Sequence, residues 1–475
     1  MTEEKLKTPQ KTKDKSEKMG TMPIGKLLFT MSVPAMISML VQALYNIVDS
    51  VYVAQIPGFG AAPTDAVSIA FPFQMLVMAF ALGIGVGGNS LIARYLGQGD
   101  KYSASKVAST GLVISIAHCL VFVVLGLTVV RPLAGLFTKS EQTVNMTVEY
   151  LSVCSVLSIF MYVEIYLNKV NQAMGRMIVP MIAQLIGAIT NIILDPIFIF
   201  NMGMGVKGAA VATVIGQANS MVFTVIMFFA MKSEAAISPK YVRIKGKTLA
   251  SIYKIGFPTI ILNAVSSFTV MIMNFLYKLF DYAIGTTILG VYFKVQSFVF
   301  MPCFGLNQGL LPVLAYNYGA NKKDRFMKAF KVALITAVSI MTVGLILFQT
   351  LSGTILSVFP HAFGTPEMKM QAVTAFRIIS ISFIPAAFCI ITITMFQSIG
   401  YGFNSMLMSI LRQLVILLPV AIFICLVFKA GYIWWAYPIA EIAVVAVFIP
   451  IAFKTISKVF AIKATISQQE NVNAA

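Results

Sequence analysis

Apolar residues occur along this chain in long runs that short polar segments separate. A run of about 20 residues crosses the hydrocarbon core of a bilayer as a helix, because a helix pairs its backbone polar groups internally. The twelve runs lie near residues 27–54, 65–93, 104–130, 145–168, 177–200, 207–231, 250–278, 286–317, 326–350, 369–395, 404–428 and 431–456. The pattern predicts an all-α integral membrane protein with twelve transmembrane helices.

The composition agrees with a membrane protein and argues against an enzyme. Of the 475 residues, 58% are hydrophobic and 11% are charged, whereas soluble domains have about 25% charged residues. The segment Gly246-Lys247-Thr248 resembles the end of a phosphate-binding loop, but Tyr241 stands where that motif needs glycine. With two histidines, no histidine-based triad or metal cluster can form. We expect no enzymatic activity, no ATP site and no cofactor.

The charged residues predict the orientation of the chain. The sequence has 35 Lys and Arg against 17 Asp and Glu, and the basic residues concentrate in the tails and the even-numbered connections. Because basic loops stay on the cytoplasmic side, we expect a multi-pass protein of the cell membrane with both termini cytoplasmic. The first 26 residues form a basic tail with no apolar stretch, and we expect no nucleic-acid partner.

The second half of the chain repeats the first. The segments FPFQMLVMAFALGIGVGGNSLIARYLG, 71–97, and FKVQSFVFMPCFGLNQGLLPVLAYNYG, 293–319, match at an offset of 222. Further matches pair Pro34 with Pro258 and Gln172 with Gln397. These offsets predict tails at 1–26 and 457–475, six-helix bundles at 27–231 and 250–456, and a cytoplasmic connector at 232–249.

The repeat also predicts a mechanism. Six spans per half give both halves the same orientation, and repeated halves of this kind in transporters hold the substrate between them and work by alternating access. We therefore expect a V-shaped transporter with a central cavity. Without ATP, it must couple to an ion gradient. The glycines from Gly83 to Gly88 lie inside an apolar span and predict a close helix contact.

Acidic residues inside spans mark candidate sites, because burying a charge in the membrane is costly. They are Asp49, Glu164, Asp195 and Glu441. Asp195 follows Asn191 by four residues, so both share one helix face, and Pro196 loosens the helix there. Asp49 lies at a similar depth, and two carboxylates at one depth can hold a proton, or Na⁺ together with hydroxyl and amide oxygens.

Four segments resemble the multidrug and toxic compound extrusion (MATE) transporters. They read LYNIVDSVYVA at 44–54, NQAMGRMIVPM at 171–181, NIILDPIFIF at 191–200 and GVKGAAVATVIGQ at 205–217. The resemblance is strongest to the prokaryotic branch whose cation site is in the N-terminal half. It implies a Na⁺ or H⁺ site from Asp49, Asn191, Asp195 and Thr213, and it places Gln42 and Asn168 on the cavity wall.

The C-terminal half lacks such an acidic site but has Lys294, Arg377 and Arg412 within its spans. An unpaired lysine facing lipid is costly, so we expect Lys294 to line the cavity or to pair with an acid. Tyr45 and Met174 are further candidates for the cavity wall.

Two functions fit these observations. The first is a monomeric exporter in which entering Na⁺ or H⁺ drives lipophilic, mostly cationic compounds out. The second is a flippase for anionic lipid-linked saccharides, for which the three basic residues would supply a cationic cavity. The NIILDP segment and the twelve spans favour the exporter.

Overall fold

The computed structural model describes residues 15–474 apart from 59, 61, 232, 245, 283 and 360–362, and the described residues are almost entirely helical. After the short α1 (Lys18–Thr21), the N-terminal half contains α2 (Ile24–Ala54), α3 (Ala62–Gly97), α4 (Lys101–Thr128), α5 (Val130–Phe137), α6 (Glu141–Val156), α7 (Ile159–Ala173), α8 (Ile178–Pro196) and α9 (Gly205–Ala230). The C-terminal half contains α10 (Gly246–Leu279), α11 (Ile284–Gly319), α12 (Lys323–Ser357), α13 (Pro366–Ser380), α14 (Phe383–Ser398), α15 (Gly402–Ile410), α16 (Leu418–Val427) and α17 (Ala436–Ala474).

The described residues contain ten to twelve candidate spans, against the twelve predicted. Ten helical segments are long and apolar enough to cross a membrane, and the number is twelve when the pairs α6–α7 and α13–α14, bent by 48° and 45°, are each counted as one span. The bends lie at Ser158 and Ser382, the same place in both halves. Each serine hydroxyl donates to the carbonyl three residues earlier, at 2.7 and 2.6 Å, and the backbone N–H of the same serine donates to the same carbonyl.

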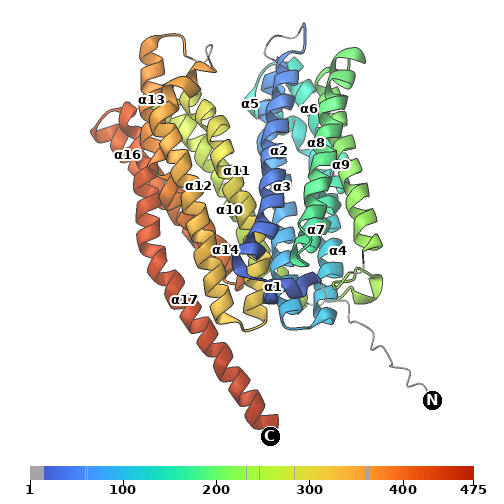
Figure 1. Ribbon diagram of the computed structural model, residues 1–475. Coiled ribbons are helices and arrows are strands. Elements are labelled where there is room, and N and C mark those ends of the chain that lie inside the picture. The colour runs from blue at the N-terminus through green and yellow to red at the C-terminus, as the bar shows by residue number, and fades with distance from the viewer. Residues whose placement is uncertain are drawn as a thin grey trace, which may run out of the picture.

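The two halves form a V (Figure 1). The bundle coloured blue to green and the bundle coloured yellow to red approach each other at the end where α1 and the last part of α17 lie, and they diverge toward the other end. We call these the closed end and the open end. The predicted fold class, two helical bundles in a V-shaped membrane protein, is confirmed.

Glycines bring the two bundles together at the closed end. A Cβ on Gly87 of α3 would lie 2.5 Å from the carbonyl oxygen of Ile252 in α10, and one on Gly309 of α11 would lie 2.8 Å from the carbonyl carbon of Met31 in α2. A Cβ on Gly97 would lie 2.1 Å from the carbonyl oxygen of Tyr316, and one on Gly319 would lie 2.1 Å from the carbonyl oxygen of Arg94. The glycines that match between the repeats therefore form the interface, because only a residue without a side chain allows backbones this close.

Helix ends and tails differ from the predicted bounds. The last span was expected to end at 456, but α17 continues to Ala474 and projects beyond the closed end (Figure 1). The chain before α1 packs on the segment after α9, where the backbone N–H of Ser16 donates to Glu234 at 3.1 Å. Residues 1–14 of the predicted basic tail lie outside the described residues.

The glycine interface leads to a stability prediction. Gly87→Ala should lower the stability of the protein by about 1–3 kcal/mol, because the added methyl group overpacks a backbone contact. Gly290→Ala on α11 is the matched control, since a Cβ there meets nothing within 4 Å. Thermal unfolding in detergent measures both variants. Equal melting temperatures for the two would contradict the interface.

A second prediction is that the closed end of the V faces the cytoplasm. Single cysteines replacing Lys101 or Lys322, both exposed at the closed end, should react with an impermeant thiol reagent only from the cytoplasm. A cysteine replacing Lys139, exposed at the open end, should react from outside. Labelling of the closed-end positions from outside alone would reverse the topology.

Candidate functional site

The centre of the candidate site is the carboxamide of Asn191 on α8. Its Nδ2 donates to Asp195 Oδ1 at 3.2 Å and to Thr213 Oγ1 of α9 at 3.3 Å. Asn191 and Asp195 share a helix face because they are four residues apart, and both are buried, at 3% and 0% exposure. The structure thus brings together the three predicted residues of α8 and α9.

Asp49 of α2 completes the site. Its carboxylate and that of Asp195 lie close enough to interact electrostatically. Asp49 Oδ1, Asn191 Oδ1 and Asp195 Oδ2 are buried oxygens without a hydrogen-bond partner. Buried polar atoms of this kind are rare in proteins, and unpaired acceptors on residues that interact with one another suit a cation.

The helix that carries Asn191 and Asp195 is irregular directly after them. Pro196 ends α8, and Ile197–Asn201 form a π-helical turn. Such turns are frequent at functional sites. Gly208 of α9 packs against this turn, because a Cβ there would lie 2.7 Å from the carbonyl carbon of Phe198. The acidic site therefore lies next to a deformable point of the span.

A cavity of about 470 Å³ with both polar and apolar wall residues borders the site. Its wall comes from α2, α3, α7, α8 and α9, and α10 and α11 of the other half close it. Asn191 and Thr213 belong to both the candidate site and the cavity wall. Among the other wall residues are Gln42, Tyr45, Glu164, Asn168, Lys169 and Gln308. The predictions for Gln42, Tyr45 and Asn168 therefore agree with their positions.

Two of the predicted wall residues are absent from the wall of this cavity. Met174 is fully buried, and its sulfur accepts a hydrogen bond from Ser233 at 3.2 Å. Lys294 is exposed on α11, eleven residues before Gly305 and hence on the same helix face. Because Gly305 packs against Met36 of α2, Lys294 faces the space between the bundles, toward the open end.

Only part of the polar wall was predicted from the sequence. Glu164 was a candidate acid without an assigned role. It accepts hydrogen bonds from Asn168 at 3.3 Å and from Ser220, and the spacing of Glu164 and Asn168 was a signal for a shared face. Lys169 was assigned to a connection, because the predicted span ended at 168, whereas α7 runs to Ala173.

Similarity to known proteins identifies the family of this chain. A model of the MatE family matches it twice, over residues 34–197 and 258–423, once in each half. The chain belongs to the MATE family of transporters. It is 27% identical to the multidrug export protein MepA of Staphylococcus haemolyticus and 28% identical to MepA of Staphylococcus aureus strain N315, over 88% of this chain and 91% of each relative.

Solved structures of the MATE family share the fold. An outward-facing multidrug resistance MATE family transporter of the MOP superfamily has a TM-score of 0.89 at 24% identity, covering 95% of this chain and 99% of that one. A MATE structure in the bent conformation has a TM-score of 0.87 at 25% identity, covering 96% and 100%.

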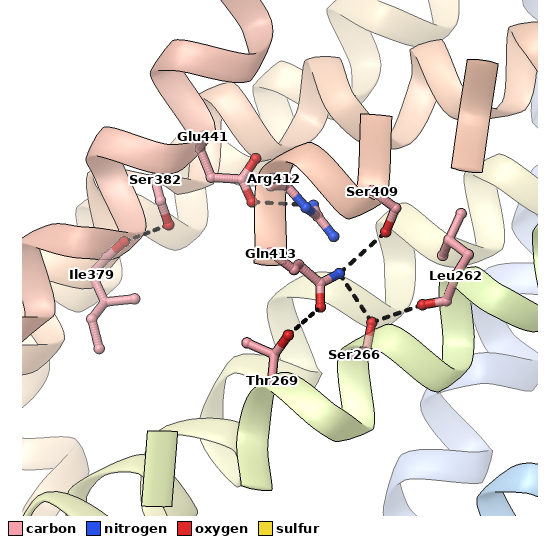
Figure 2. A network of polar contacts seen from close by, with 9 residues as sticks. All are labelled: Leu262, Ser266, Thr269, Ile379, Ser382, Ser409, Arg412, Gln413 and Glu441. Atoms are coloured by element: carbon pink, nitrogen blue, oxygen red, sulfur yellow. Dashed lines mark hydrogen bonds and ion pairs between the residues drawn. The ribbon is translucent and has the colours of Figure 1, made fainter. Parts of the chain in front are cut away.

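In this MATE transporter, the corresponding region of the C-terminal half holds an ion pair. Arg412 Nη1 lies 3.1 Å from Glu441 Oε1 of α17, with side-chain exposures of 18% and 14% (Figure 2). The neighbouring Gln413 bonds to Thr269 and Ser266 of α10, both at 3.1 Å. The corresponding N-terminal pair, α8 and α9, instead meets at Gly187 and Gly216, where a Cβ on Gly216 would lie 2.8 Å from the Gly187 oxygen.

The ion pair gives a testable stability prediction. Glu441→Ala should cost about 2–3 kcal/mol, because it leaves a largely buried guanidinium without its counter-charge. Replacing both partners, Arg412→Met with Glu441→Leu, should recover most of that loss. Glu149→Ala, at an exposed acid of α6, is the control for thermal unfolding. A double variant no more stable than Glu441→Ala would contradict a purely structural pair.

Proposed function

We propose that this protein is a secondary active multidrug exporter in which entering Na⁺ or H⁺ drives lipophilic, mostly cationic compounds out of the cell by alternating access. The observation that carries the proposal is that Asp49, Asn191 and Asp195 each have a buried oxygen without a hydrogen-bond partner, beside a cavity of about 470 Å³. The relatives whose names state multidrug export support it.

The cation would act at the two carboxylates. When the site is empty, Asp49 on α2 and Asp195 on α8 repel each other, and a bound cation or proton removes that repulsion. Binding therefore draws α2 toward α8, and the π-helical turn after Pro196 lets α8 change shape. Because Asn191 and Thr213 also line the cavity, an ion at the site alters the surface that the substrate meets.

The cavity suits a lipophilic cation. Its volume falls within the range of about 300–1,000 Å³ that is usual for drug-sized ligands. Its acidic residue is Glu164, and the hydroxyl of Tyr45 lies within electrostatic reach of Asp49, Glu164 and Asp195. Methionines such as Met39 and Met161 are part of the wall, and their flexible thioethers adapt to ligands of different shape.

The energy of one ion is adequate for export. A charge that crosses 100 mV releases about 2.3 kcal/mol, which corresponds to roughly a 50-fold concentration ratio. With cytoplasmic termini, the V would face outward, and the glycine interface would be the part that separates when the cavity opens inward.

The flippase alternative loses most of its support. Arg412 is engaged by Glu441, and Arg377 Nε donates to the carbonyl of Gln349 at 3.1 Å. A pyrophosphate headgroup needs several cationic donors, and of the three basic residues that favoured a flippase only Lys294 faces the space between the bundles.

Removing the charge of the coupling site should abolish export. Asp195→Asn and Asp49→Asn keep the side-chain size, so folding should stay near normal while gradient-driven efflux of ethidium is lost. The double variant should be no worse than either single variant, because the two carboxylates act as one site.

Efflux is measured in cells at matched expression, with Asp65→Asn, at an exposed acid of α3, as control. Proteoliposomes with a Na⁺ gradient alone and then a pH gradient alone identify the ion. Wild-type export by Asp195→Asn would refute the mechanism.

A further inference from the structure

Lys169 is a nearly buried cation at the closed end of the cavity. It is 7% exposed, and its ammonium donates to Gln172 Oε1 at 3.1 Å and to Gln308 Oε1 of α11 at 3.0 Å. Both partners are neutral amides. No carboxylate among the described residues forms an ion pair with Lys169. Because an ammonium has three donors, one remains for a ligand in the cavity that Lys169 lines.

The fold makes room for this lysine. A Cβ on Gly85 of α3 would lie 2.8 Å from Lys169 Cγ, so the lysine stem fills the space that glycine leaves. Asn89, one turn further along α3, donates to the carbonyl of Lys169 at 3.0 Å. The stem and backbone of Lys169 are thus held by α3, and its ammonium is held by Gln172 of α7 and Gln308 of α11.

The repeat shows that the lysine is specific to the N-terminal half. Gly85 matches Asn307 at the offset of 222, and Lys169 matches Thr394 at the offset of 225 that pairs Gln172 with Gln397. In the C-terminal half, Thr394 and Asn307 are hydrogen-bonded to each other. A neutral pair on one side is therefore replaced on the other by a lysine and a glycine, which adds a positive charge at the cavity.

We infer that Lys169 forms a subsite for a carboxylate group and so determines how strongly the cavity binds an amphiphile with a carboxylate relative to its ester. Glu164 lies five residues before Lys169 on α7, about 7.5 Å along the helix axis. The cavity therefore offers an acid for a cationic group and an ammonium for a carboxylate within the length of one drug-sized molecule. This inference rests on the proposed function, because it assigns a specificity-determining residue to the same cavity.

Two dyes with one ring system test the subsite. Tetramethylrhodamine has a free carboxylate and is a zwitterion, whereas its methyl ester is a cation. Fluorescence anisotropy with purified protein, without any gradient, gives the ratio of the two affinities. We define the ratio as the affinity for the acid divided by the affinity for the ester. Lys169→Gln should reduce this ratio by about tenfold or more, because the acid loses a charge-assisted hydrogen bond that the ester does not make. Lys169→Arg, which keeps the charge, should preserve more of the ratio than Lys169→Gln.

A second variant moves the lysine without changing it. Gly85→Ala should lower the same ratio by displacing the lysine stem, and Gly290→Ala serves as its control. Lys328→Gln, at an exposed lysine of α12, controls for the loss of a charge. Equal loss of both dyes in Lys169→Gln would show that the lysine only joins the bundles, and it would overturn the subsite. An unchanged ratio, or wild-type protein that does not bind the acid, would overturn it as well.

Measuring transport of the two dyes under an ion gradient distinguishes a failure of this inference from a failure of the proposed function. If the acid binds in a Lys169-dependent way but neither dye is exported under an ion gradient, the subsite stands and the exporter proposal fails. If the ester is exported and Lys169→Gln changes both dyes alike, the exporter stands and the subsite fails.

Discussion

The close backbone contact between the bundles is the constraint on which the rest of the molecule depends. Lipid tails are as apolar as leucine, so helices in a membrane associate through packing rather than through the hydrophobic effect. Here Gly87 and Gly309 allow α3 to meet α10 and α2 to meet α11. These glycine contacts lie at the closed end, the helices diverge beyond them, and the cavity lies where the divergence begins.

The two halves share one fold but differ in their buried polar residues. In the N-terminal half, α8 and α9 meet through glycines, and Asn191 Oδ1 and Asp195 Oδ2 have no hydrogen-bond partner. In the C-terminal half, Arg412 and Glu441 neutralise each other across the corresponding helices. An ion can therefore bind where the charges are uncompensated, whereas the paired charges stabilise the other bundle. The repeat supplies the scaffold, and the unequal side chains supply the site.

The sequence predicted the features that depend on local pattern. Apolar runs gave the spans, the repeat gave the two bundles, and the spacing of Asn191 and Asp195 gave a shared helix face. It missed features that depend on contacts between distant segments. Lys169 was assigned to a connection because the predicted span ended one residue before it. A charged residue near the end of an apolar run does not by itself end a helix. Nothing in the sequence indicates that Gln308, in the other half, approaches that lysine, or that Met174 faces away from the cavity.

The position of Lys169 at the boundary between the bundles has a consequence for the proposed cycle. Opening the closed end separates α7 from α11, so the bond from Lys169 to Gln308 must break. A buried ammonium without a partner would make that step costly. Gln172 prevents this, because it lies three residues after Lys169 on the same helix, bonds to the same ammonium and moves with it. Gln172 also donates to Gln308 at 3.0 Å, so the cluster closes the cavity while the bundles touch and still solvates the lysine after they part.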